Sequence, residues 1–201
     1  MFLATTLRVA YRGEYMVTFT CITAAPTSWS FTNGIASSNP GTRRLTDHEF
    51  RILNTLMPTA RNGTPIDVVK RESPDFEVKY SNDDVCFVEV VEAVPEVQDT
   101  NTGTISNLER LRHHGRRDNR SVTYTADWKK YSRCIADRID EKTKLAKKWE
   151  VTPIYLLVWV SNPVPTTPFS DYVVEAGLLI DSVSPFVKLV IGNPGQIYIS
   201  S

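Results

Sequence analysis

The sequence predicts an α/β fold in which a mixed central sheet is flanked by helices. Two segments, 84–94 and 153–161, are apolar almost throughout, which is typical of strands buried on both faces. Two others, 45–58 and 126–149, carry apolar residues at helical spacing. Because these helices alternate with the buried strands along the chain, we expect the helices to cover a common sheet.

Turn and cap signals give the order of the remaining elements. Thr46 or Asp47 would cap the first helix, and Pro58 would end it. The polar stretch 95–125 has weak periodicity, which predicts a long excursion with one short helix. The other expected elements are a strand at 74–80 that is joined to 84–94 by a turn, a helix at 171–183, and strands at 186–192 and 196–200.

The length of 201 residues favours a single domain with an extension. We assign residues 45–201 to that domain and residues 1–44 to an N-terminal extension. Within the extension, 23–44 is rich in Ser, Thr, Asn, Gly and Pro, which predicts a loop. The formal net charge of zero indicates no particular partner.

The cysteines and the apolar segments bear on the compartment. Cys21, Cys86 and Cys134 are odd in number, widely spaced and unpaired with histidines, so neither a disulfide framework nor a zinc site is expected. We expect no signal peptide, because the first residues lack a basic segment followed by a hydrophobic block. No run is long enough for a membrane helix, and a reducing cytoplasm fits best.

Four charged side chains fall at positions that should face the core. On a helical wheel, Glu49 lies near the middle of the apolar arc of 45–58, and Lys142 lies close to the centre of the arc of 126–149. Glu89 and Glu92 interrupt the apolar strand 84–94. A buried carboxylate is costly unless a cation or hydrogen bonds compensate it, so these charges suggest a shared polar site.

Each of these positions also has a purely structural interpretation. Glu49 could sit at the edge of its helix, and Lys142 could extend its head to water along the helix. Asp75, which follows Pro74 at a strand start, could serve a turn. Glu92 lies on the opposite face of its strand from Glu89 and nearer its end, so for Glu92 the structural interpretation is favoured.

Pro74 and Asp75 in "SPDF", together with Glu89 in "FVEVV", resemble the motif of the PD-(D/E)XK nuclease superfamily. The resemblance covers about residues 45–161 and implies a restriction-endonuclease-like αβββαβ core. Val91 stands where the motif has its lysine. Some branches of the family carry this lysine on the neighbouring helix, and Lys142 looks like such a migrated residue, while Glu49 looks like the acid that the first helix often contributes.

The resemblance implies a metal-dependent nuclease with Asp75, Glu89, Lys142 and Glu49 as catalytic residues. Asp75 and Glu89 would bind the metal, with Glu49 joining directly or through water. Oxygen ligands without clustered histidines favour Mg²⁺ or Mn²⁺ over Zn²⁺. Lys142 would orient the attacking water and offset negative charge on the phosphate.

A basic segment from Arg110 to Lys148 contains about thirteen Lys and Arg against five Asp and Glu. A solvated helix face with a loop would also produce such a segment. We expect nucleic acid, DNA ahead of RNA, to lie along it, we expect no membrane partner, and a homodimer stays open. The residues expected to contact nucleic acid are Arg110, Arg112, His113, His114, Arg116, Arg117, Arg120, Lys129 and Lys130.

Three functions fit these features. The first is a metal-dependent nuclease. The second is a protein that keeps the nuclease fold without catalysis and binds nucleic acid or a protein partner, as loss of the motif lysine would suggest. The third is a structural role for buried ion pairs, which requires Glu49 and Lys142 to pair with each other.

Overall fold

A computed structural model of the chain describes residues 4–9, 17–22, 43–63, 65–80, 83–125, 127–161, 168–180, 182–193 and 196–200. Its helices are α1 (Arg43–Ala60), α2 (Leu108–Arg117), α3 (Trp128–Ala146) and α4 (Phe169–Leu179). Its strands are β1 (Ala4–Val9), β2 (Val17–Ile22), β3 (Pro65–Lys70), β4 (Phe76–Tyr80), β5 (Val85–Ala93), β6 (Glu96–Asp99), β7 (Ile105–Asn107), β8 (Tyr124–Thr125), β9 (Ile154–Val160), β10 (Lys188–Gly192) and β11 (Ile197–Ser200).

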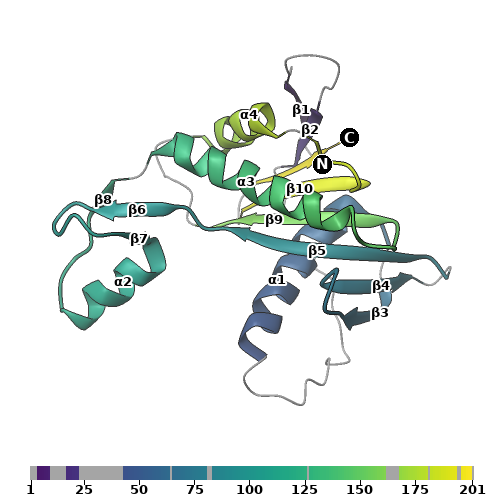
Figure 1. Ribbon diagram of the computed structural model, residues 1–201, viewed down its shortest axis with the longest axis horizontal. Coiled ribbons are helices and arrows are strands. Elements are labelled where there is room, and N and C mark those ends of the chain that lie inside the picture. Colours follow the sequence, from purple (N-terminus) through teal and green to yellow (C-terminus); the bar gives the residue numbers. More distant parts are fainter. Residues whose placement is uncertain are drawn as a thin grey trace.

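Eight strands form one mixed sheet in the order β1-β2-β11-β10-β9-β5-β4-β3. The central strand β9 runs parallel to both β5 and β10, and the other pairs are antiparallel. Helix α1 covers one face of this sheet, while α3 and α4 cover the other (Figure 1). The chain is therefore a mixed α/β protein whose central sheet is flanked by helices, as the sequence predicts.

The two faces of the sheet carry separate hydrophobic cores. On the α1 face, Leu53 and Leu56 pack against alternate residues of β4 and β5 such as Val78 and Val88. On the other face, Ile135 and Ile139 of α3 belong to the core formed with α4 and the opposite sides of β5 and β9. Strand β9 supplies both cores and is buried at six of its seven positions, which explains its continuous apolar run.

The long helices and the buried strands agree with the sequence predictions, with corrections in the first helix and in α3. Pro58 does not end the first helix, since α1 continues through it to Ala60, although Pro58 has no N–H for the helical bond to Asn54. In α3, Leu145, which the helical wheel places on the apolar arc of 126–149, is 40% exposed, whereas Thr143 is buried. Most of the loop predicted at 23–44 lies outside the described residues, but Arg43 and Arg44 begin α1. Thr46 and Asp47 therefore lie inside the helix, and the prediction that one of them caps it is wrong.

Three strands of the large sheet were not predicted from the sequence. Strands β1 and β2, from the segment assigned to an N-terminal extension, pair with each other and continue the sheet beyond β11. Strand β3 forms the opposite edge and pairs with β4. Its pattern conceals it, because Pro65 and Val68 are buried while Ile66 and Val69 are exposed, and this is not a clean alternation.

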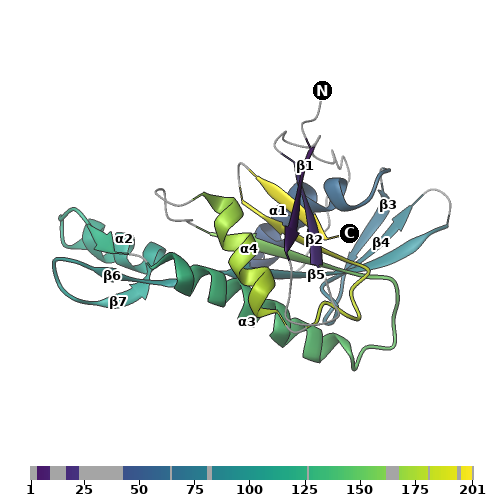
Figure 2. The same ribbon diagram turned by 90° about the horizontal axis from the view of Figure 1, so that it is seen from above.

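The excursion between β5 and α3 folds into a small unit of its own, which we call the arm (residues 96–125). It contains the three-stranded sheet β7-β6-β8 and α2, the one helix expected in this stretch. The arm projects from the end of the main sheet in both views (Figures 1 and 2). The fully buried carboxylate of Asp99 accepts a hydrogen bond from Arg120 Nη1 at 2.7 Å, and this bond holds the pKa of Asp99 below its usual value.

Among the described helices, none combines the length and the apolar composition needed to cross a bilayer.

The packing of α2 against the rest of the arm depends on Gly115. A Cβ atom at Gly115 would lie 2.4 Å from Val122 Cγ2 and 3.0 Å from the backbone oxygen of Arg120. We expect Gly115→Ala to lower the free energy of opening the arm by about 1–3 kcal/mol, the usual range for overpacking. Hydrogen exchange should then quicken in residues 96–125 and not in β5 or β9. His114→Ala, an exposed change on the same helix, should leave exchange unchanged; equal effects of the two variants would contradict this packing.

Candidate active site

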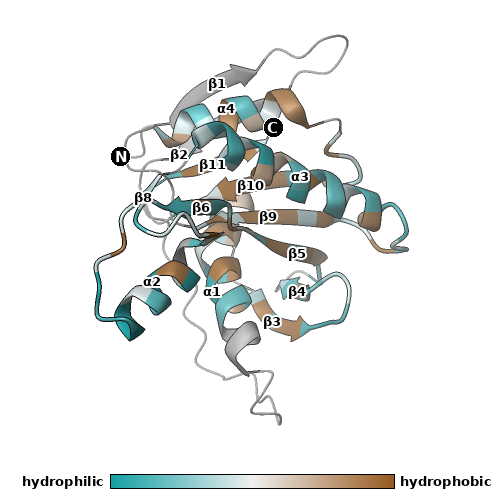
Figure 3. Cartoon of the chain, turned by 60° about the vertical axis from the view of Figure 1, so that its left-hand side comes forward, coloured by the Kyte–Doolittle hydropathy of each residue, from teal (hydrophilic) through white to brown (hydrophobic). Residues whose placement is uncertain are grey.

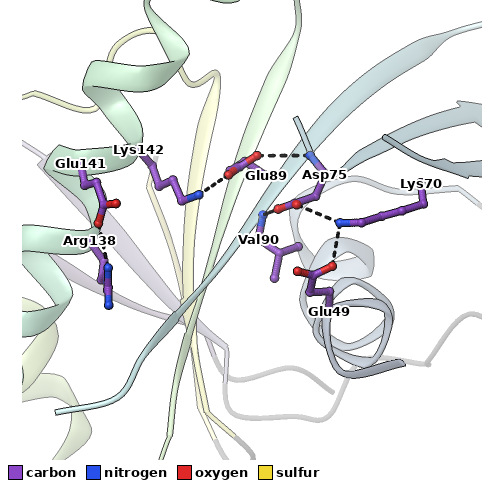
Figure 4. Close-up of polar contacts among 8 residues, drawn as sticks. All are labelled: Glu49, Lys70, Asp75, Glu89, Val90, Arg138, Glu141 and Lys142. Atoms are coloured by element: carbon purple, nitrogen blue, oxygen red, sulfur yellow. Dashed lines mark hydrogen bonds and ion pairs between the residues drawn. The ribbon is translucent and has the colours of Figure 1, made fainter. Parts of the chain in front are cut away.

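The site is built around Glu89, in the middle of β5. This side chain is 4% exposed and lies on the face of the sheet that α3 covers. Its Oε1 atom accepts a hydrogen bond from Lys142 Nζ at 2.5 Å, and its Oε2 atom accepts one from the backbone N–H of Asp75 at 3.2 Å (Figure 4). Glu89 thus receives partners from a helix and from a second strand.

Lys142 reaches this carboxylate from α3. The residues on either side of it along the same helix face, Ile139 and Thr143, are buried, so the helix presents this side of itself to the sheet. The lysine side chain is 22% exposed and ends on Glu89. The alternative in which Lys142 extends its head into water is therefore wrong, and the inward position predicted from the helical wheel is confirmed.

Asp75 lies immediately before β4 and faces β5. Its Oδ2 atom accepts a hydrogen bond from the backbone N–H of Val90 at 2.8 Å, and its Oδ1 atom accepts one from Lys70 Nζ at 2.8 Å. The carboxylate therefore does more than close a local turn, because it ties the start of β4 to the middle of β5. Val90 is the residue after Glu89, so Asp75 and Glu89 are fixed against each other by two bonds between backbone and side chain.

Lys70, the last residue of β3, is a member of the site that the sequence did not reveal. Its Nζ atom donates to Glu49 Oε2 at 2.6 Å and to Asp75 Oδ1 at 2.8 Å, and it lies 4.7 Å from the centre of the Phe76 ring. Burial lowers the pKa of Lys70, but the hydrogen bonds to Asp75 and Glu49 outweigh this effect and raise it overall. To find Lys70 from the sequence, one would first have to recognise strand β3, because the end of that strand lies beside Asp75.

These five residues form a continuous line of contacts, which we call the polar row: Lys142, Glu89, Asp75, Lys70 and Glu49 (Figure 4). The row passes from α3 on one face of the sheet, across the ends of β4 and β3, to α1 on the other face. With all groups ionised it holds three carboxylates and two ammonium groups, so one negative charge is left without a matching cation inside the row.

The structure separates the predicted acids into two kinds. Asp75 and Glu89 are held together directly, whereas Glu49 contacts Asp75 only through Lys70. Glu49 and Lys142 do not pair with each other, since each has a different partner. The structural hypothesis that required a Glu49–Lys142 pair is therefore wrong.

Burial and the neighbouring charge of Asp75 raise the pKa of Glu89, and the hydrogen bond from Lys142 only partly opposes them. A buried carboxylate whose ionisation burial and a neighbouring charge disfavour would gain from a bound cation. No three His, Cys, Asp or Glu side chains of the described residues form a ready metal-binding group. The donor chemistry of Asp75 and Glu89 nevertheless fits a hard divalent ion, because both offer carboxylate oxygens and the two residues are in contact through the Asp75 backbone N–H.

Val91 stands where the motif has its lysine. It is two residues after Glu89 on the same face of β5, and it packs in the core between the sheet and α3. This position is therefore apolar, and the ammonium group that contacts Glu89 comes from Lys142 on α3.

Glu92 lies outside the polar row, as its position on the other strand face predicts. Its Oε2 atom lies 3.1 Å from His48 Nε2 on α1, and its Oε1 atom accepts a hydrogen bond from Ser161 Oγ. The Glu92 side chain is 32% exposed, so its charge remains accessible to water. We assign Glu92 to the contact between α1 and the sheet.

The residues expected to contact nucleic acid divide between α2 and the start of α3. Helix α2 buries Leu111 and Gly115 and exposes its other described residues. Figure 3 colours much of α2 as hydrophilic and strands β5 and β9 of the main sheet as mostly hydrophobic. The exposed residues are Arg110, Arg112, His113, His114, Arg116 and Arg117 of α2, with Lys129 and Lys130 of α3. Arg120 instead pairs with buried Asp99 and holds the arm together.

An open cavity of about 650 Å³ lies between the base of the arm and α3. Val97 and Cys134 line its interior, and Lys130, Arg133 and Arg138 line it from α3. Arg138 and Glu141, which are joined by a hydrogen bond of 2.8 Å, stand one turn or less from Lys142 on the same helix. The cavity therefore connects the arm with the helix that carries the lysine of the site.

Removing the cation from Glu89 should destabilise the fold. We expect Lys142→Met to lower the free energy of unfolding by about 3 kcal/mol, because a buried carboxylate loses its partner. Lys144→Met, an exposed change on the same helix, should stay within about 0.5 kcal/mol of the parent chain. Urea unfolding measures both.

The double variant Glu89→Gln/Lys142→Met should be more stable than Lys142→Met alone, since it leaves no charge without a partner. Equal stabilities of Lys142→Met and Lys144→Met would show that the Glu89–Lys142 contact contributes little.

Comparison of the chain with protein-family models, with curated proteins and with solved structures gave no match. The chemistry of the polar row and of the arm is therefore what indicates the function of this chain.

Proposed function

We propose that this chain is a metal-dependent nuclease that hydrolyses phosphodiester bonds of nucleic acid, DNA ahead of RNA. One observation carries the proposal: Asp75 and Lys142, from elements far apart in the sequence, both bind the buried carboxylate Glu89. Two adjoining acids beside an inward ammonium group provide the charges that hydrolysis of a phosphodiester needs.

The order of elements supports a restriction-endonuclease-like core. The segments α1, β3, β4, β5, α3 and β9 follow the αβββαβ order that the sequence resemblance implies. Sequence patterns alone gave only two strands before the excursion, and β3 supplies the third. The same strand carries Lys70 to the site, so the sequence patterns that did not predict β3 could not predict Lys70 either.

Asp75 and Glu89 would hold Mg²⁺ or Mn²⁺, which would polarise a phosphoryl oxygen and favour ionisation of the attacking water. Lys142 Nζ, which already lies against Glu89, would hold that water by a hydrogen bond and offset charge on the phosphate. The water oxygen would form a bond to phosphorus as the bond from phosphorus to the ester oxygen breaks and leaves its electrons on that oxygen. The proton released by the attacking water would pass to solvent, and the departing ester oxygen would take up a proton from solvent.

The arm would hold the nucleic acid. Four arginines and two histidines project from the ten-residue α2, and Lys129 and Lys130 follow where the arm joins α3. Phosphate contacts by such side chains give affinity without selecting a sequence. The cavity beside Lys130 and Arg138 lies along the turns of α3 that precede Lys142.

A second function is favoured by one observation. Val91 replaces the motif lysine, and Lys70 and Lys142 already neutralise most of the charge on the acids. A protein that binds nucleic acid or a protein partner without cutting would tolerate such a site. Binding by the arm together with intact nucleic acid after incubation with metal would favour this alternative.

Cleavage should depend on Asp75, Glu89 and Lys142. We expect Asp75→Asn, Glu89→Gln and Lys142→Met each to lower the rate of DNA cleavage in Mg²⁺ or Mn²⁺ at least about a hundredfold, as loss of charge stabilisation does in enzymes. Gel assays on plasmid and on single-stranded DNA measure the rate.

Matched controls come from the same elements. Glu92→Gln lies on the other face of β5, and Lys144→Met lies on the exposed side of α3. Both should retain the parent rate within about threefold, which is small beside the loss expected in the site. Cleavage that survives Asp75→Asn would refute the catalytic assignment.

Binding through the arm should be electrostatic and independent of metal. In EDTA, we expect Arg116→Ala to reduce the slope of log affinity against log salt by about 1 for duplex DNA, because one phosphate contact is lost. Fluorescence anisotropy across a salt series measures this slope. Lys79→Ala on β4, an equal loss of charge away from the arm, should leave the slope unchanged, and a matching change in both variants would argue against the arm.

A further inference from the structure

Lys70 occupies the space between two carboxylates that the nuclease resemblance would assign to one metal. Its ammonium group donates to Glu49 Oε2 at 2.6 Å and to Asp75 Oδ1 at 2.8 Å, the distances of charge-assisted hydrogen bonds. The side chains are 29% exposed for Lys70, 28% for Glu49 and 16% for Asp75, so the contacts are partly shielded from water. The Lys70 ammonium group also lies over the Phe76 ring.

An ammonium group in this position competes with a metal ion. A lysine head is a compact point charge whose donors here are directed at both acids. A Mg²⁺ ion bridging the two acids would compete for carboxylate oxygens at about 2.0–2.1 Å and would be repelled by the ammonium charge beside it. Lys70 and a divalent ion therefore cannot bridge Glu49 and Asp75 at the same time.

The other side of Asp75 has a different character. Between Asp75 and Glu89 the contacts are backbone N–H groups, from Asp75 itself and from Val90, and no lysine bridges these two carboxylates. Lys142 binds only the far oxygen, Oε1, of Glu89. A cation entering the row meets less competition there than at Glu49.

We propose that Lys70 is an internal cation that excludes divalent metal from Glu49 and confines it to Asp75 and Glu89, so that the chain binds one metal ion. This inference rests on the proposed metal-dependent function. Lys70 acts as a positioning residue: it occupies the place of a second ion and fixes the Asp75 carboxylate toward β5. Glu49 then holds Lys70 instead of holding the metal.

The test measures Mn²⁺ binding by isothermal titration calorimetry in the absence of nucleic acid. We expect the parent chain to bind one ion and Lys70→Met to bind a second ion or to bind the first at least tenfold more tightly. Lys70→Arg, which keeps the charge, and Lys79→Met on the adjacent strand should behave like the parent. Adding Glu49→Gln to Lys70→Met should abolish the gain, because the freed carboxylate would be lost.

A second variant tests the same inference without removing Lys70. Glu49→Gln in the parent chain should leave the Mn²⁺ stoichiometry unchanged and the affinity within about threefold, while Asp75→Asn should abolish binding. A tenfold or greater loss in Glu49→Gln would overturn the inference, since Glu49 would then be a ligand.

The outcomes separate this inference from the proposed function. One ion bound equally by the parent and by Lys70→Met overturns the role of Lys70 and leaves the nuclease proposal standing. Two ions in the parent also overturn it. A gain of metal binding in Lys70→Met with none in the parent supports the competition and contradicts the metal-dependent function. Absence of binding in both overturns both proposals.

Discussion

A carboxylate in the middle of a buried strand requires a cation, and the contact between Glu89 and Lys142 meets this requirement. For this pair to form, the face of α3 that carries Lys142 must lie on β5, and the apolar residues of that face pack in the same core. Val91, beside Glu89, belongs to this core too. The buried charge and the apolar packing around β5 therefore favour the same placement of α3.

The polar row joins two hydrophobic cores that otherwise lie on opposite faces of the sheet. Lys142 comes from α3 on one face of the sheet, and Glu49 comes from α1 on the other. Asp75 and Lys70 connect the two sides at the start of β4 and the end of β3. Apolar packing secures each helix separately. The row is the place where polar contacts connect the two layers, and each acid in it has a hydrogen-bond donor.

Glu89 and Lys142 could be predicted from the sequence because each breaks a strong pattern, an apolar strand in one case and an apolar helix face in the other. Lys70 could not, because it ends a short edge strand whose two exposed apolar residues, Ile66 and Val69, hide its alternation. The arm was predicted as an excursion with a helix, but its three short strands have too few residues for a periodic signal. Arg120 looked like its basic neighbours, since only the fold reveals the buried Asp99.

The arm is inserted between the two elements that carry the site, β5 before it and α3 after it. From Trp128, where α3 begins, to Lys142 is about 20 Å along the helix axis at the standard rise per residue. That span corresponds to about six base pairs of duplex at the usual spacing of 3.4 Å. In the proposed function, an oligonucleotide bound by the arm would have to extend about that far along α3 before its backbone reached Glu89, so a shorter fragment would contact the arm or the site but not both.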